Sequence, residues 1–483
     1  MNKTRLSRSI LPIFLCAAVP ALTGCEALYF TFGPGGLWPA DSGSSTAKDG
    51  ATATTQPATV TGFGFTTRQL DPKLEATAGA RVVVAADMNG DGFLDFVSGS
   101  AESQPIQLHL RDPNSEDYTT ITIAGGAPIS TMYDLAVADF DGDGRPDIAV
   151  LVNDTGYVPV SQSAKKRGAV VLLFNPQDTA DPLSWQSVTI TCTFLLPGDD
   201  TGLTEFAVAD IDGQGGPDIV LASNEITSQA NSVTKYVYLL RNPTGAAARS
   251  GNNWASTTVW ADVPSVKSVK IADIDGDGDL DIGVTYPSAK SQNISWLKNP
   301  LLESGLAAVQ AGNWVDLTIG EQRELQQPGD TQVPGADFLA LGDIDGDGAI
   351  DAVVAHQSLG VIQWFRNPGT SIVGQVNYPW EVYTIGMTAN AAQINQLQLV
   401  DMDQNGLLQV FITGSGNMAA FKRGLNVQDY WQPYTITGTS PAATIGKCAF
   451  ADINGDGLLD IVAPLDREGI TDDEFLIIQR ITP

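Results

Sequence analysis

Histidine and cysteine are scarce in this chain, which has two histidines and four cysteines among its 483 residues. The patterns G-x-S-x-G, H-E-x-x-H and Walker A, which mark nucleophilic, zinc-dependent and phosphate-binding sites, do not occur. His109 falls in the predicted strand from Ile106 to Leu110, and His356 follows another, so packing or surface roles are expected for both. The sequence therefore predicts a protein that is not an enzyme.

Positive charge is also in short supply. The chain has 26 Lys and Arg against 55 Asp and Glu, which gives a formal net charge of −29. Such a chain is repelled by nucleic acid and by anionic membrane surfaces, and it attracts cations. We therefore expect no nucleic-acid partner.

Long apolar runs are missing as well, because no later segment has 18 uninterrupted apolar residues. Residues 1–24 begin with Lys3, Arg5 and Arg8 and continue with the apolar run Ile10–Val19, which is too short to cross a bilayer. This pattern predicts a secretory signal. Residues 26–60 are rich in Gly, Pro, Ser, Thr and Ala, and they are expected to form a flexible tether.

The signal ends in Leu22-Thr23-Gly24-Cys25, which resembles the lipobox of bacterial lipoproteins. The resemblance implies cleavage before Cys25, lipidation of its sulfur and export, with the lipid as the sole membrane anchor. Glu26 follows instead of the Asp linked to inner-membrane retention, which favours the outer membrane or cell surface. An ordinary signal peptide with a chance cysteine is the alternative. Cys192 and Cys448 fall in separate repeats, so no disulfide framework is expected.

One motif recurs through the rest of the chain, from residue 61 to 483. The motif D-x-[DN]-x-[DN]-G-x-x-D starts at Asp87, Asp139, Asp273, Asp343 and Asp452, with altered copies at Asp210 and Asp401. Two other features recur between these loops: apolar runs that end in Asn-Pro, as at Asn367-Pro368, and the pattern W-x-x-x-T, as at Trp380. The chain thus divides into seven units of similar length.

Each unit reads as four short strands. In the fifth unit they are Phe338–Leu341, Ala352–Ala355, Val361–Phe365 and Trp380–Ile385, rich in β-branched and aromatic residues. Seven such units predict an all-β fold, a seven-bladed β-propeller of four-stranded blades.

The ends of the repeat region predict how the ring closes. The last unit supplies three strands, Cys448–Ala451, Ile461–Ala463 and Phe475–Gln479, and lacks a fourth. The segment Phe63–Arg68 precedes the first aspartate loop without a blade of its own. We expect it to be the outer strand of blade seven, which removes the open seam. A disordered N-terminal extension is the alternative.

The aspartate loops suit calcium, a hard cation that takes six to eight oxygen ligands. Oxygens at loop positions 1, 3, 5 and 9, with the backbone carbonyl at position 7, can surround one ion. Position 12 is never Glu, which excludes an EF-hand. The candidate ligands of the five intact loops are Asp87, Asn89, Asp91, Phe93 and Asp95; Asp139, Asp141, Asp143, Arg145 and Asp147; Asp273, Asp275, Asp277, Asp279 and Asp281; Asp343, Asp345, Asp347, Ala349 and Asp351; and Asp452, Asn454, Asp456, Leu458 and Asp460.

The loops, their spacing and the four-strand units resemble the FG-GAP/VCBS repeats of bacterial surface proteins, which are related to the propeller of integrin alpha subunits. The resemblance implies that each loop joins the first and second strands of a blade and binds calcium. Two loops depart from the pattern, with Gln214 at position 5 of the third and Gln409 at position 9 of the sixth. These two sites are expected to be weak or empty.

The resemblance implies a surface binding, adhesion or scaffold module with a protein or glycan ligand. A calcium-dependent polysaccharide lyase and a lectin are the alternatives. Ligand contacts are expected in the variable connections on the face opposite the aspartate loops. These are Asn153–Gly168, which contains Lys165-Lys166-Arg167, Asn224–Thr234, and Gly320–Ala336.

Overall fold

The computed structural model describes most of the repeat region. The described residues are 64–70, 80–100, 106–123, 132–154, 167–190, 200–226, 235–261, 266–286, 294–320, 336–357, 360–369, 380–387, 394–402, 404–415, 417–423, 427–428, 431–436, 443–466 and 474–481. The predicted signal, Cys25 and the tether lie outside them, as does Cys192. No helix in these ranges is long and apolar enough to cross a membrane.

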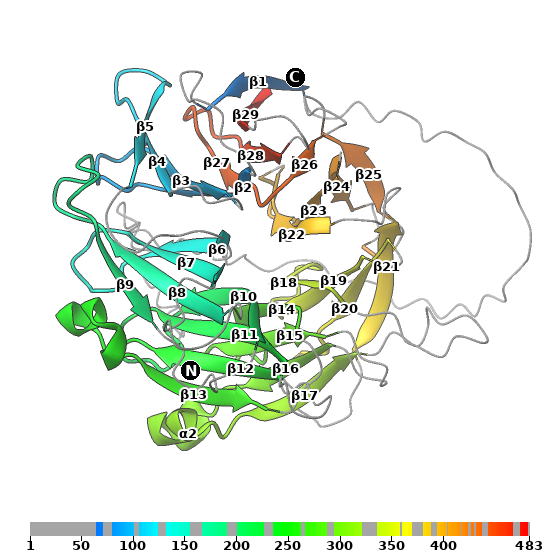
Figure 1. The fold of residues 1–483 in the computed structure, drawn as a ribbon. Helices are drawn as coiled ribbons and strands as arrows, with labels where there is room; N and C mark the ends of the chain where they lie inside the picture. Colours follow the sequence, from blue (N-terminus) through cyan, green and yellow to red (C-terminus); the bar gives the residue numbers. More distant parts are fainter. Residues whose placement is uncertain are drawn as a thin grey trace, which may run out of the picture.

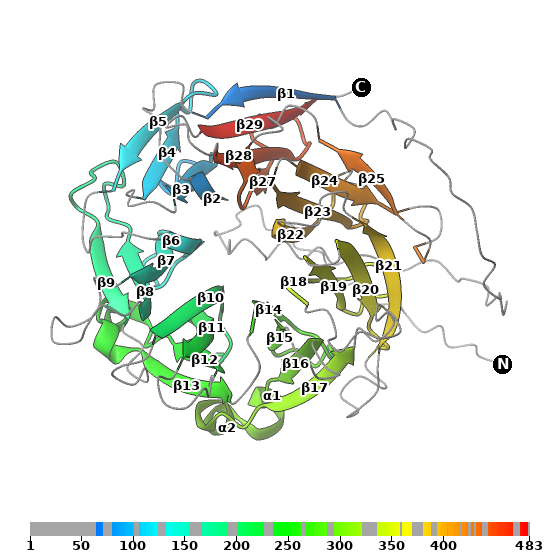
Figure 2. The same ribbon diagram turned by 45° about the vertical axis from the view of Figure 1, so that its right-hand side comes forward.

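The strands form seven antiparallel blades around a central axis, as predicted (Figures 1 and 2), and a parallel contact between the third strand of the second blade and the first strand of the third joins these two blades into one eight-stranded sheet. Blades one to three are β2 (Ala80–Ala86), β3 (Asp95–Ser100), β4 (Gln107–Arg111) and β5 (Tyr118–Thr122); β6 (Met132–Ala138), β7 (Asp147–Asp154), β8 (Arg167–Phe174) and β9 (Gln186–Ile190); and β10 (Asp200–Ala209), β11 (Asp218–Ile226), β12 (Lys235–Arg241) and β13 (Ala255–Trp260). Blades four to six are β14 (Ser268–Ala272), β15 (Asp281–Thr285), β16 (Ile294–Lys298) and β17 (Val315–Gly320); β18 (Phe338–Gly342), β19 (Asp351–His356), β20 (Val361–Arg366) and β21 (Glu381–Met387); and β22 (Ile394–Val400), β23 (Gln409–Gly414), β24 (Asn417–Lys422) and β25 (Gln432–Thr435).

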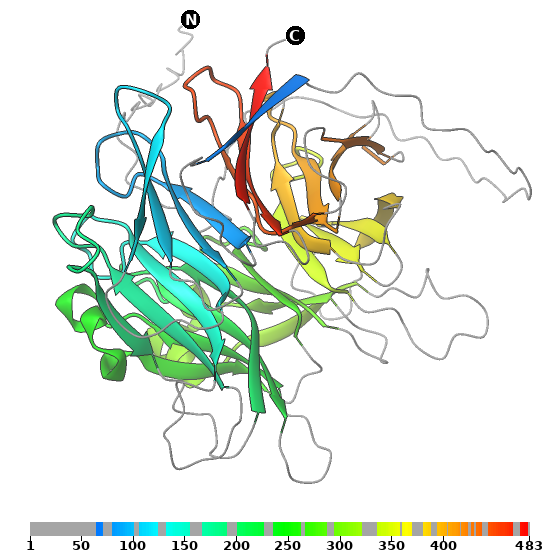
Figure 3. The same cartoon turned by 45° about the horizontal axis from the view of Figure 1, so that its top comes forward.

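Blade seven joins the two ends of the repeat region, as predicted. It contains β26 (Thr444–Ile445), β27 (Ala449–Ala451), β28 (Asp460–Asp466), β29 (Glu474–Ile481) and, as its outer strand, β1 (Gly64–Gln69). Strand β1 pairs antiparallel with β29, from Gly64 opposite Ile481 to Gln69 opposite Leu476. Figure 3 shows the first and last strands side by side. The predicted inner strand Cys448–Ala451 corresponds to β27, and an additional short strand, β26, precedes it. Between the two, Lys447 pairs with Val82 of blade one.

The core lies between neighbouring blades. Every residue of β15 and of β19 is buried, because each second strand is covered by a blade on both sides. Four of the five tryptophans that open outer strands, Trp185, Trp254, Trp380 and Trp431, are at most 8% exposed, and the fifth, Trp314, is partly buried. Their apolar rings fill the space between blades, as their repeat-matched positions predicted.

Short helices, which the sequence did not predict, interrupt the all-β pattern in blades three and four. They are the 3-10 helices η2 (Gly245–Arg249) and η3 (Gly251–Asn253) and the α-helices α1 (Leu301–Ser304) and α2 (Leu306–Ala311). A Cβ at Gly251 would lie 2.2 Å from the carbonyl oxygen of Thr189, and one at Gly312 would lie 2.4 Å from that of Thr258. These insertions therefore press on the outer strand of the preceding blade and cover part of its edge.

Two of the predicted variable connections are shorter than expected. Strand β7 continues to Asp154 and β8 begins at Arg167, so the predicted connection from Asn153 to Gly168 starts and ends as paired strand. Strand β11 likewise extends to Ile226. Thr201 of β10 pairs in parallel with Arg167, which joins blades two and three on this face. Residues 155–166, 227–234 and 321–335, with Lys165 and Lys166, lie outside the described residues.

Candidate metal centres

Each aspartate loop links the first strand of a blade to the second, as the resemblance implied. The glycine at position 6 has a positive φ in all seven loops, from +82° at Gly406 to +101° at Gly278. Position 4 also has a positive φ, and it is Gly in every loop except the sixth, where Gln404 has φ 52°. The predicted motif includes the glycine at position 6 but not the one at position 4, although glycine also recurs there.

The first aspartate of each loop holds the turn together. In blade two, Asp139 Oδ1 accepts hydrogen bonds from the backbone N–H groups of Gly142 (2.8 Å) and Asp143 (3.1 Å), and its Oδ2 accepts one from Gly144 (2.8 Å). Blades one, five and seven repeat all three bonds. These hydrogen bonds stabilise the turn of the loop.

The last aspartate of the motif links the loop to the third strand. In blade five, Asp351 accepts the N–H of Ile344 at position 2 (3.1 Å) and the N–H of Asn367 at the end of β20 (2.7 Å). The same pair of bonds recurs at Asp95, Asp147, Asp218, Asp281 and Asp460. Burial raises the pKa of these carboxyls, to about 8 for Asp147 and Asp281 and to about 7 for Asp95. A nearby cation would favour their ionised form.

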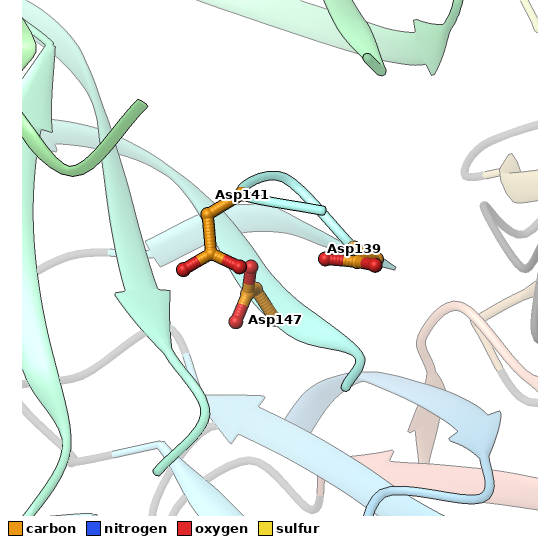
Figure 4. A group of neighbouring side chains, drawn as sticks. All are labelled: Asp139, Asp141 and Asp147. Atoms are coloured by element: carbon orange, nitrogen blue, oxygen red, sulfur yellow. The ribbon is translucent and has the colours of Figure 1, made fainter. Parts of the chain in front are cut away.

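Four loops bring three carboxylates close enough to share one metal ion. Their ligand oxygens lie within 4.8 Å of one another in the sets Asp139, Asp141, Asp147; Asp210, Asp212, Asp218; Asp273, Asp275, Asp281; and Asp343, Asp345, Asp347. Figure 4 shows the first set gathered at the end of its loop. Blade three is among the four, so Gln214 leaves its acid cluster intact. The reason to expect weak metal binding in blade three is therefore only that Gln214 offers a neutral amide where the other loops have an acid or Asn.

The loops of blades one and seven have Asn at position 3 and therefore fewer carboxylates. Asn89 Nδ2 donates to Asp91 Oδ2 at 3.0 Å, and Asn454 Nδ2 donates to Asp456 Oδ2 at the same distance. The Asn carbonyl oxygen remains a suitable calcium ligand. In blade six, Gln409 at position 9 is buried at 2% exposure. The carbonyls predicted as ligands at position 7 remain predictions.

Basic side chains form ion pairs with the acid sets of blades two, four and five. Lys298, at the end of β16, contacts Asp275 and lies 2.9 Å from Asp277. Arg366 contacts Asp345 and Asp347 in the same way in blade five, and Arg249 of η2 contacts the blade-two loop from blade three. These cations neutralise part of the loop charge, and a metal ion at positions 3 and 5 would displace them.

The donor set of the blade-four loop fits a hard cation. Asp273 Oδ1 and Asp279 Oδ1 are buried and have no hydrogen-bond partner among the described residues. Burial, and to a smaller extent the negative charges of Asp277 and Asp275, raise the pKa of Asp279 to about 6. Unpartnered carboxylate oxygens are costly to bury, and a bound calcium ion would supply the missing partner. Asp273, Asp275, Asp277 and Asp281 are the side chains that would hold it.

The residue at the end of each third strand ties its blade to the loop of the preceding blade. Asn175, Asn242, Asn299 and Asn367 donate Nδ2 to the position-2 carbonyls of the preceding loops, at Met88, Phe140, Ile211 and Ile274. Where Asn is absent, Arg111, Arg423 and Arg480 donate to Ile453, Ile344 and Met402. These contacts join all seven blades in a ring. The Asn-Pro motif was predicted only as a strand stop, and nothing in it signals the arginine substitutes.

Comparison with known proteins agrees with this geometry. The family model described as FG-GAP-like repeat matches residues 87–150 and 401–463. The chain carries FG-GAP-like repeats. The two matches run from the first loop through the second and from the sixth loop through the seventh, and the loops of the blades between them have the same backbone geometry.

Several solved structures are similar to this chain at low sequence identity. An Agrocybe aegerita lectin that recognises non-reducing terminal N-acetylglucosamine is 16% identical, with TM-score 0.44, over 83% of this chain and 94% of that one. A Bacillus licheniformis rhamnogalacturonan lyase is 15% identical, with TM-score 0.43, over 86% and 75%. The BBS1 N-terminal domain crystallised with ARL6 is 10% identical, with TM-score 0.48, over 87% and 98%. No curated protein matches the chain in sequence.

Proposed function

We propose that this FG-GAP propeller is a calcium-stabilised module for binding, adhesion or scaffolding, exported and held at the outer membrane or cell surface by a lipid on Cys25. The observation that carries the proposal is the set of four acid clusters, each with ligand oxygens within 4.8 Å. Ions in these loops hold the first and second strands of each blade in register, and the ring contacts of the third strands pass that order to the neighbouring blade.

A non-catalytic role is supported by how the residues best suited to chemistry are packed. His109 is buried and lies 2.8 Å from both Ser98 Oγ and Thr120 Oγ1, and His356 is buried at the end of β19. Trp364 and Trp431 are fully buried, so they fill the core and do not present a stacking surface to sugars.

The ligand of this module, a protein or a glycan, is proposed to bind the face opposite the calcium loops. Antiparallel blades place the connections between second and third strands on that face. The pairing of Arg167 with Thr201 links the second and third blades there. Replacing residues 155–166 by a two-residue turn should abolish binding in a glycan and protein array. Unchanged binding would exclude this connection, and turnover of a polysaccharide would favour the lyase alternative.

The calcium part of the proposal is tested by thermal unfolding of the full chain in excess EDTA and in millimolar calcium. Ligands that bind only the folded state stabilise it by mass action, so calcium should raise the melting temperature by several degrees. Magnesium at the same concentration tests selectivity, since it prefers a stricter octahedral site. Identical melting curves with and without EDTA would contradict calcium stabilisation.

A further inference from the structure

Four charged side chains from the innermost strands of four different blades meet near the propeller axis. They are Asp134 of β6, Glu205 of β10, Lys270 of β14 and Lys447, which lies between β26 and β27. Lys447 Nζ is 2.6 Å from Asp134 Oδ2 and 3.6 Å from Glu205 Oε1, and Lys270 Nζ is 2.9 Å from Glu205 Oε1. Since these strands line the centre of the ring (Figure 2), Lys447 of blade seven reaches past blade one to blades two and three.

The network is shielded from solvent and balanced in charge. The side chains of Asp134, Glu205 and Lys270 are 10–12% exposed, and that of Lys447 is 27% exposed. The remaining carboxylate oxygens are also satisfied, because Glu205 Oε2 accepts the N–H of Val269 and Asp134 Oδ1 accepts the N–H of Leu135, both at 3.0 Å. Removing one member would leave a buried charge without its partner, which is strongly destabilising.

The backbone around Lys447 binds blade one at the place where the ring closes. The N–H of Lys447 donates to the carbonyl of Arg81 at 2.8 Å, and the N–H of Val83 donates to the carbonyl of Lys447 at 3.1 Å. A Cβ at Gly446 would lie 2.0 Å from the carbonyl oxygen of Arg81, so only glycine permits this approach.

The other side of the same segment binds blade six. Gln396 accepts the N–H of Cys448 (2.8 Å) and donates to its carbonyl (3.1 Å), and Thr413 Oγ1 donates to the carbonyl of Gly446 (2.8 Å). Residues 446–448 therefore contact blades six and one through hydrogen bonds and blades two and three through the Lys447 ammonium group.

We propose that Lys447 is a central brace that locks the seam between blades seven and one. The rim of blade seven is closed by β1, and the centre is closed by this brace. Opening the seam requires the ion pairs to blades two and three to break, so the closed ring opens cooperatively. The brace contains no loop residue and acts with or without bound calcium.

Hydrogen exchange on the full-length chain tests the brace, with Lys447→Met as the variant. The amide of Val83, at the seam, should exchange at least about tenfold faster, which corresponds to about 1.4 kcal/mol. The amide of Trp380, which donates to Ile319 between blades five and four, should change much less. Lys267→Met serves as the matched control, because it removes an exposed lysine that lies directly before β14. Equal acceleration at Val83 and Trp380, or none at Val83, would overturn the proposal.

A double variant separates the brace from general damage. Asp134→Asn should also speed exchange at Val83, and adding it to Lys447→Met should cause little further change, because both remove the same ion pair. Fully additive effects would contradict the proposed contact. Since the effect is expected equally in EDTA and in calcium, a failure of the calcium proposal leaves this test valid.

Discussion

Asn367 Nδ2, at the end of the third strand of blade five, donates a hydrogen bond of 2.8 Å to the carbonyl of Ile274 in the aspartate loop of blade four. The same amide group donates to Ile350 at 2.8 Å, and the backbone N–H of Asn367 donates to Asp351. One residue therefore contacts two neighbouring loops, which gives the FG-GAP ring a continuous connection from loop to loop.

Replacing this residue should loosen two blades at once. Asn367→Ala leaves two carbonyls without their donor, and the expected loss in the free energy of unfolding is about 1–3 kcal/mol. Chemical denaturation measures it, with Asn252→Ala, which alters an exposed residue of η3, as the control. A loss no larger than that of the control would show that the ring contact contributes nothing to stability.

Replacing Gln404, at position 4 of the sixth loop, by the glycine found there in the other loops should stabilise the protein. Gln404 is exposed and has φ 52°, a conformation that costs a non-glycine residue roughly 1–2 kcal/mol. Gln404→Gly should therefore raise the free energy of unfolding, by up to about 1 kcal/mol after the greater flexibility of glycine in the unfolded chain is counted. The thermal midpoint measures the change. A decrease would contradict the backbone argument.

The brace should be insensitive to pH across the neutral range. Burial alone would raise the pKa of Glu205, but attraction to Lys270 and Lys447 outweighs it and the pKa is lowered. Burial would lower the pKa of Lys447, but Asp134 and Glu205 outweigh it and the pKa is raised. The contribution of Glu205 is thus present above its unfolded pKa of about 4.3 and lost as pH falls through its folded pKa. That of Lys447 is present below about 10.4 and lost as pH rises through its folded pKa.

The stability difference between the native chain and Lys447→Met should accordingly be the same at pH 6 and pH 9, and it should shrink in strong acid. Denaturation at the three pH values measures it. A difference that disappears between pH 6 and pH 9 would show that one of these groups is not ionised as described.

The fold was predictable because one loop motif repeats with its own turn chemistry. The spacing of the aspartate loops gave seven blades, and the unpaired segment before the first loop gave the closing strand β1. The loop geometry followed from Gly at position 6. What could not be predicted depends on contacts between distant residues. Three such contacts were not predicted: the hydrogen bonds from the Asn of Asn-Pro to the preceding loop, the equivalent bond from Arg480, and the ion pair of Lys447 with Asp134. Each joins residues of different blades, and each local sequence is equally compatible with an ordinary surface position.

Metal binding itself is measured most directly by equilibrium dialysis of the metal-depleted full chain against calcium. The account predicts several ions per chain at free calcium of about 10⁻⁴ to 10⁻³ M, and one ion fewer in the variant Asp139→Asn with Asp141→Asn. The exposed pair Asp117→Asn with Asp178→Asn should leave the number unchanged. Absence of bound calcium at millimolar concentration, or an equal count in the blade-two variant, would contradict it.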